Sequence, residues 1–281
     1  MSSEFVMLPA CMVDVLARMV GSFAKLADHR KSNLLSSMET FPTRLSVNVN
    51  KIATLRNARG GSVPCPIGAA EHLQRWGANG ITVHPRPDAR HITYDDVRAL
   101  RPVVHTEFNI EGYPSEDFIQ LVLDVRPDQV TLVPDPPDAL TSNAGWDTLA
   151  HGDLLRPVLA RFREVGIRTS LFIETDAARI RAAANLGADR IELYTEAFAV
   201  AHAQGDPSAA TPFAAAAKVA HEAGLGVNAG HDLNLDNLAD FALAVHPLEE
   251  VSIGHALISD ALYLGLQNTV GQYKEALRPK A

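Results

Sequence analysis

The sequence contains little cysteine and no excess of basic charge. Its 281 residues include only two cysteines, Cys11 and Cys65, and carry a formal net charge of −8. Two cysteines make neither a disulfide framework nor a zinc pattern, so a reducing compartment and a cytoplasmic location are expected. An acidic chain is unsuited to general nucleic-acid binding, which usually requires a basic face. Small anionic molecules remain possible partners, because local cations can override the net field.

A membrane-spanning segment is also missing. The longest apolar stretch, residues 5–24, is interrupted by Asp14 and Arg18 and lacks the basic start and cleavage site of a secretory signal. No transmembrane helix and no membrane partner are therefore expected. The apolar spacing of this stretch instead predicts an N-terminal helical extension at residues 1–40, ahead of a catalytic domain at residues 41–281. The alternative is a mis-assigned start, with Met38 as the natural one.

From Leu45 onward, strand and helix patterns alternate. Eight short apolar runs resemble buried strands, at residues 44–49, 80–83, 103–110, 129–133, 168–173, 190–194, 226–229 and 250–253. Helical patterns follow them, at residues 68–76, 94–100, 115–125, 147–165, 176–186, 212–223, 235–245 and 259–277. Eight such units predict an α/β protein with one closed (β/α)₈ TIM barrel. The alternative is an open doubly wound sheet, but the turn after the first strand, Asn48-Val49-Asn50-Lys51, lacks its glycine-rich fingerprint.

The stretch at residues 80–93 leaves the predicted sheet abruptly. Its β-branched start predicts a strand, and Pro85 and Pro87 cannot supply the N–H groups that would continue that strand past His84. The loop that follows presents three more cationic or titratable side chains, Arg86, Arg90 and His91. A strand end with this composition suits an enzyme that acts on anionic substrates, and the alternative is a solvated loop with incidental charge.

The ends of the other predicted strands carry similar residues. Active sites of barrels lie at the C-terminal ends of the strands. Polar or ionisable residues occupy those positions, namely Asn48, Lys51, His84, Glu111, Thr141, Glu174, Asp176, Glu192, His231 and His255. Each one alone is more often structural, and Glu192 has the alternative of an exterior residue paired with Arg179 or Arg181. Their convergence predicts one functional site, because buried ionisable groups are unfavourable unless paired or used.

Three classes of chemistry are candidates for such a site. Barrel metallohydrolases usually carry His-x-His at the end of the first strand, where this chain has Asn48-Val49-Asn50, so no metal is expected. A Schiff base requires a buried lysine, and only Lys51 lies near the predicted rim. Acid/base catalysis by histidine and glutamate side chains is therefore the most economical hypothesis.

Phosphate recognition is the second activity that the pattern indicates. The loop cations and Arg59 can form charge-assisted hydrogen bonds to phosphate. Gly254, followed by His255, opens the last helical segment, where backbone N–H groups can approach a phosphate. Barrels often keep a phosphate site after strands seven and eight.

Several segments together resemble the pyridoxine 5′-phosphate synthase family, which closes the ring in one route to vitamin B6. They lie at residues 52–60, 80–93, 109–111, 227–231 and 253–255, and the likeness runs in order from about residue 45 to residue 277. The resemblance implies a TIM barrel assembled as a homo-octamer, with no metal and no organic cofactor. It also implies the condensation of 1-deoxy-D-xylulose 5-phosphate with 3-amino-2-oxopropyl phosphate to pyridoxine 5′-phosphate, phosphate and water.

The resemblance also implies roles for individual residues. His84 and Glu111 correspond to proton acceptors, His231 to a proton donor and Glu192 to a residue that stabilises the transition state. The residues expected to bind the xylulose phosphate are Arg59, Arg86, His91 and Thr141. Those expected to bind the amino-ketone phosphate are Asn48, Gly254 and His255. Loops near Thr141 and at residues 196–211 are candidate lids.

Two positions depart from the pattern of the family. Many members carry Asp-His where this chain has Asn50-Lys51, and Gly where it has Asp232. Lys51 and Asp232 are retained as candidate substrate contacts, and Asn50 is assigned no proton-transfer role. The alternatives to the synthase are another phosphate-sugar isomerase or epimerase barrel and a non-catalytic barrel that binds a phosphorylated metabolite.

Overall fold

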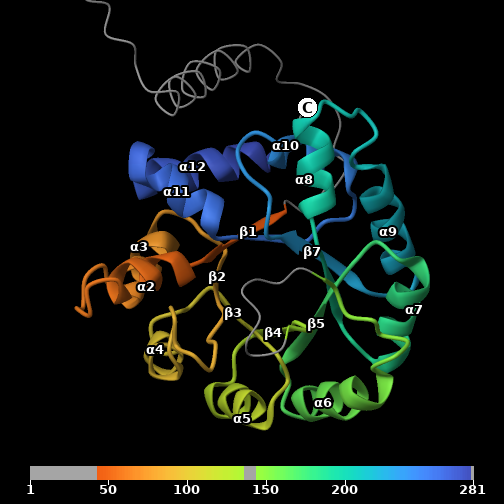
Figure 1. Ribbon diagram of the computed structural model, residues 1–281, viewed down its shortest axis with the longest axis horizontal. Helices are drawn as coiled ribbons and strands as arrows, with labels where there is room; N and C mark the ends of the chain where they lie inside the picture. Colours follow the sequence, from red (N-terminus) through yellow and green to blue (C-terminus); the bar gives the residue numbers. More distant parts are fainter. Residues whose placement is uncertain (1–42, 136–143, 280–281) are drawn as a thin grey trace, which may run out of the picture. The chain divides into compact units, whose positions relative to one another are not determined.

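The computed structural model describes residues 43–135 and 144–279, in which eight parallel strands close into a barrel in chain order (Figure 1). The strands are β1 (Arg44–Asn48), β2 (Gly80–Val83), β3 (Glu107–Gly112), β4 (Gln129–Leu132), β5 (Arg168–Ile173), β6 (Arg190–Leu193), β7 (Gly226–Gly230) and β8 (Glu250–Ile253). Parallel pairing of β1 with β8, with Leu45 opposite Val251, closes the ring. The predicted TIM barrel is confirmed. The predicted N-terminal extension and Thr141 lie outside the described residues.

Helices surround this barrel in Figure 1. They are α2 (Asn50–Asn57), α3 (Pro66–Arg75), α4 (Tyr94–Leu100), α5 (Glu116–Val125), α6 (Gly152–Glu164), α7 (Ala177–Leu186), α8 (Glu196–Ala203), α9 (Thr211–Glu222), α10 (Leu238–Ala244), α11 (His255–Leu264) and α12 (Leu266–Ala276). None of the helices in the described ranges is long and apolar enough to span a membrane.

Local sequence signals explain many helix boundaries. Ser115 and Asp176 cap α5 and α7 by accepting hydrogen bonds from backbone N–H groups three residues on, as predicted. Gly187 ends α7 with a φ of 95°, a left-handed conformation that glycine adopts without a steric penalty. The predicted start at Ser259 is wrong, because α11 begins at His255 and the Ser259 hydroxyl donates to the His255 carbonyl.

Other elements also differ from the predictions. Helices α2 and α8 occupy segments where no helix was predicted, and the single last helix is divided at Gly265, whose φ is 77°. The third strand begins at Glu107 instead of residue 103. Its expected first residues are held outside the sheet, because the Gln74 side chain accepts hydrogen bonds from the N–H groups of His105 and Thr106.

Side chains alternate along the strands between an apolar layer and a polar barrel interior. On β1, Leu45 and Val47 belong to the hydrophobic core, while Ser46 between them hydrogen-bonds Thr82 at 2.7 Å. Asn109 donates to the same Thr82 hydroxyl and accepts from Thr131. These links join β1 to β4 through the middle of the barrel and satisfy polar groups that burial would otherwise penalise.

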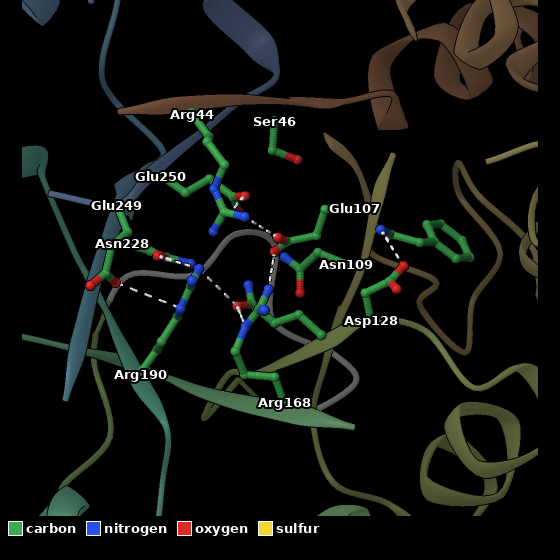
Figure 2. Close-up of polar contacts among 12 residues, drawn as sticks. Arg44, Ser46, Glu107, Asn109, Asp128, Arg168, Arg190, Asn228, Glu249 and Glu250 are labelled. Atoms are coloured by element: carbon green, nitrogen blue, oxygen red, sulfur yellow. Dashed lines mark hydrogen bonds and ion pairs between the residues drawn. The ribbon is translucent and has the colours of Figure 1, made fainter. Parts of the chain in front are cut away.

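The N-terminal end of the barrel is filled by an ionic cluster (Figure 2). Glu107 receives Arg44 on one carboxylate oxygen at 2.8 Å and Arg168 on the other. Arg190 contacts Asn228 at 3.2 Å and Glu249 at 3.6 Å. Burial, and then the neighbouring Glu107, raise the pKa of Glu250 to about 8. These residues close the end of the barrel opposite the predicted catalytic rim, and none of them was predicted from the sequence.

Candidate active site

Three of the predicted site residues meet at the C-terminal ends of β1, β2 and β3. His84 Nδ1 lies 3.8 Å from Glu111 Oε2, and both side chains are 13% exposed. The same carboxylate oxygen accepts a hydrogen bond from Asn48 Nδ2 at 3.4 Å. An imidazole, a carboxyl group and an amide, contributed by consecutive strands, therefore line one edge of the rim.

Burial sets the charge of His84. Desolvation, and then the positive charges of Arg86 and His91, lower the pKa of His84 to about 3. The imidazole is neutral at physiological pH and can accept a proton without first losing one. Asn50 fixes the backbone here, because its Oδ1 accepts a hydrogen bond of 3.0 Å from the His84 N–H. Asn50 was assigned no proton-transfer role from the sequence, and nothing in a lone asparagine indicates this contact.

Burial favours the neutral form of two carboxyl groups as well, and there it raises the pKa. Burial, and then Glu192 and Glu250, raise the pKa of Glu111 well above its ordinary value. Burial also raises the pKa of Glu192 to about 7, partly offset by His231 and by a hydrogen bond with Thr131. Mutual repulsion favours a protonated carboxyl group in this part of the barrel.

Glu192 lies inside the barrel, and the exterior alternative for it is wrong. The residue is 5% exposed. Arg179 pairs with Glu174 at 3.0 Å and with Asp147 at 3.2 Å. A short strand with apolar neighbours on both sides of the glutamate does not reveal which face is the interior, and only closure of the barrel decided it.

The strand β7 brings the third histidine to the same rim. His231 follows the last residue of β7, and its Nδ1 lies 2.9 Å from Asp232 Oδ2. The Tyr194 ring meets the imidazole edge-on, with the ring centroids 5.6 Å apart. The hydrogen bond to Asp232 is the largest cause that raises the pKa of His231.

The cationic loop after β2 contributes a buried arginine and a second imidazole. Arg86 is 7% exposed and its Nη2 lies 4.0 Å from Asp135 Oδ2. Burial, and then Arg86 and Lys51, lower the pKa of His91 to about 4. His91 packs edge-on against His84. A small pocket beside them is lined by His84, Arg86, Tyr94, Tyr113, Ser115 and Asp135.

Two residues that the sequence analysis missed hold the His91 segment in place. Arg56 forms a two-pronged ion pair with Asp96, with distances of 2.6 and 2.8 Å, and also donates to the His91 carbonyl. Asn57 donates to that carbonyl at 2.9 Å. The sequence signal that could have revealed this segment is the spacing of Thr93 and Asp96, which form a capping box at the start of α4.

The remaining predicted contacts are distributed around the rim. A Cβ on Gly254 would lie only 3.0 Å from Asn48 Cβ, so glycine is what allows the end of β8 to approach the end of β1. His255 starts α11 and is exposed. Lys51 and Arg59 are also exposed, within α2 and just beyond it. Arg90 pairs with Asp88 through a 2.6 Å hydrogen bond from its Nε.

Comparisons with known proteins agree in family and fold. A family model described as pyridoxal phosphate biosynthesis protein PdxJ matches residues 45–279. Curated proteins named pyridoxine 5′-phosphate synthase from Christiangramia forsetii and Bacteroides fragilis are 59% identical over 236 residues, which is 84% of this chain and 100% of each relative.

Solved structures with little sequence identity share the barrel. A Thermotoga maritima phosphoribosylanthranilate isomerase is 13% identical with a TM-score of 0.52, and the match covers 84% of this chain and 98% of that one. A Vibrio cholerae 3-keto-L-gulonate-6-phosphate decarboxylase is 11% identical with a TM-score of 0.57, over 84% of this chain and 97% of that one. At such identities the likeness concerns the fold alone.

Proposed function

The chain belongs to the family described as pyridoxal phosphate biosynthesis protein PdxJ, and from this membership we infer that it is a pyridoxine 5′-phosphate synthase. We propose that it acts as a transferase that condenses 1-deoxy-D-xylulose 5-phosphate with 3-amino-2-oxopropyl phosphate, releasing phosphate and water. The observation that carries the proposal is one rim on which a neutral histidine, two carboxyl groups of raised pKa and a histidine of raised pKa are combined.

Ring closure by this route requires repeated proton transfers, and the rim supplies groups of both kinds. We assign His84, which is neutral, as a proton acceptor, and His231, which is biased toward the protonated form, as a donor. A raised pKa makes Glu111 a stronger base once it is ionised, which fits a second acceptor. We assign Glu192 to stabilisation of the transition state, because a carboxyl group that is protonated near neutral pH can donate a hydrogen bond to developing negative charge.

Two phosphate groups need two cationic or N–H-rich positions. We propose that Arg86 and His91, with Arg59 and Thr141, bind the xylulose phosphate. Gly254 and His255 at the start of α11, with Asn48 beside them, would bind the other phosphate, since a helix N-terminus favours anions. Lys51 and Asp232 stay candidate contacts, and the homo-octamer stays a prediction.

A turnover assay with both substrates tests the proposal. Pure protein should form pyridoxine 5′-phosphate and inorganic phosphate together, and neither product should form when one substrate is omitted. His231→Ala should lower kcat at least ~100-fold, in the range expected for loss of a general acid. His221→Ala removes an exposed histidine on α9 and should leave the rate unchanged. Absence of pyridoxine 5′-phosphate from the wild-type reaction would contradict the assignment.

A further inference from the structure

The turn after β7 holds His231 in an unusual backbone conformation. Its φ is 47°, in the left-handed region that non-glycine residues rarely occupy. Such a conformation is unfavourable for a non-glycine residue and persists only where the surroundings enforce it. His231 lies on the candidate rim, and contacts of its neighbouring residues maintain this strained conformation.

Those contacts lie on both sides of His231. The buried Thr195 hydroxyl donates to the Gly230 carbonyl and accepts from the Asp232 N–H at 3.3 Å. Asn237 Nδ2 donates to the Asp232 carbonyl at 3.2 Å. The residues before and after the histidine are therefore each anchored, and the position of the Asp232 side chain relative to the imidazole is fixed by the backbone.

The anchored turn places a carboxylate against one particular ring nitrogen. Asp232 Oδ2 lies 2.9 Å from His231 Nδ1, and the two side chains are 30% and 39% exposed. A carboxylate can only accept, so Nδ1 carries a hydrogen in this arrangement. The other ring nitrogen, Nε2, is then the atom that can exchange a proton with a substrate.

The electrostatic surroundings act in the same direction. After Asp232, the carboxyl groups that raise the pKa of His231 when they are ionised are Glu192 on β6 and Glu196 at the start of α8, while burial opposes them. Tyr194, which packs on the ring, donates its hydroxyl to Glu196 at 2.7 Å and is held neutral, because burial raises its pKa. No positive charge is among the groups that shift the pKa of His231 in the described part of the chain.

We propose that Asp232 is a positioning residue that fixes His231 as the Nδ1–H form and keeps the imidazole protonated for donation from Nε2. In the reaction proposed above, on which this inference rests, imidazolium Nε2–H gives its proton to a hydroxyl group that leaves as water. The histidine is left as the neutral Nδ1–H imidazole, still hydrogen-bonded to Asp232, and recovers its proton from solvent or from a later step. Asp232 itself transfers no proton.

Replacement of Asp232 by asparagine tests this role, because asparagine keeps the size and one acceptor oxygen but removes the charge. Nitrogen-15 NMR of labelled histidine should place the hydrogen of neutral His231 on Nδ1 in the wild type. The midpoint of the His231 titration should fall by about 1 pH unit in Asp232→Asn, as expected when a partly exposed opposite charge is removed. The alkaline limb of kcat/KM should move to lower pH by the same amount.

Two controls separate this role from a structural one. Asp240→Asn breaks the comparable pair between His202 Nε2 and Asp240 at 3.0 Å, on the exposed side of α8, and should leave the kcat/KM profile unchanged. Asp232→Glu should restore part of the titration shift. An unchanged His231 midpoint in Asp232→Asn, or a neutral Nε2–H form in the wild type, would overturn the proposal. Because the titration is measured on resting protein, it decides the question even if the proposed reaction fails.

Discussion

The buried hydroxyl of Thr195 offers a sharp test of how the rim is built, because valine has nearly the same shape without the oxygen. Thr195 is 0% exposed and connects β6 to the turn after β7 through two hydrogen bonds. Thr195→Val leaves the Asp232 N–H without this acceptor, whereas the buried Gly230 carbonyl keeps the Leu233 N–H as a donor at 3.2 Å. The unsatisfied N–H costs roughly 1–3 kcal/mol and the hydrogen bond lost at the carbonyl about 1 kcal/mol more, so the free energy of unfolding should fall by about 2–4 kcal/mol.

The effect on catalysis should exceed the effect on stability. Without the hydroxyl, the turn can relax from the left-handed conformation of His231, and a displacement of about 1 Å can lower the rate ~100-fold. We expect kcat to fall at least ~10-fold at a temperature where the variant is fully folded. The melting temperature should fall by about 5–15 °C, using the usual entropy of a domain of this size.

Thr269→Val is the matched control. Thr269 is equally buried, and its hydroxyl donates to the Gly265 carbonyl at 3.0 Å, far along the chain in α12. That carbonyl also accepts from the Thr269 N–H, so its loss should cost only about 1 kcal/mol and leave kcat unchanged. Thr195→Ser, which keeps the hydroxyl, should retain most activity. Full activity of folded Thr195→Val would refute the reasoning.

Two further predictions concern other parts of the barrel. Because the pKa of Glu250 is raised from 4.5 to about 8, the fold favours its protonated form, and its contribution to stability is present below about pH 4.5 and is lost as pH rises to about 8. The free energy of unfolding of Glu250→Gln should therefore be closest to that of the wild type at acid pH, and the variant should be relatively more stable at pH 9. Urea unfolding at both pH values measures this difference, and the opposite trend would contradict the assignment. Arg56→Lys cannot reproduce the two-pronged pair with Asp96, so the His91 segment should loosen. The KM for the xylulose phosphate should then rise several-fold, with a smaller change in kcat. An unchanged KM would argue against a binding role for that segment.

The order of strands was readable because each strand is a short apolar run that follows a helix end. The glycine at 187 and the caps at Ser115 and Asp176 are local signals that operate wherever they occur. Helices α2 and α8 were missed because they bury very little, only Ile52 and Ala53 in the first and Phe198 in the second. A helix with so small a buried face leaves a weak periodic pattern.

The identities of the rim residues were also predictable, but their partners were not. His84, Glu111 and His231 each follow or end an apolar run, and a barrel collects such positions at one end. The contact between Asn50 and the His84 backbone joins residues 34 apart, and the clamp by Thr195 joins residues 35 and 37 apart. Long-range hydrogen bonds of this kind have no periodicity and no local composition to reveal them.

The sequence by itself determined the barrel, its family and the side chains carried by the strand ends, because apolar spacing, caps and family motifs are local properties. Only the tertiary structure decided that Glu192 points inward and that the N-terminal end of the barrel holds a buried ionic cluster. It also decided that the pKa values of His84 and His231 are shifted in opposite directions. The reason is that protonation depends on burial and on charges contributed by other strands, which closure of the barrel brings within a few ångströms. Two histidines that look alike in the sequence therefore differ in protonation only in the folded protein.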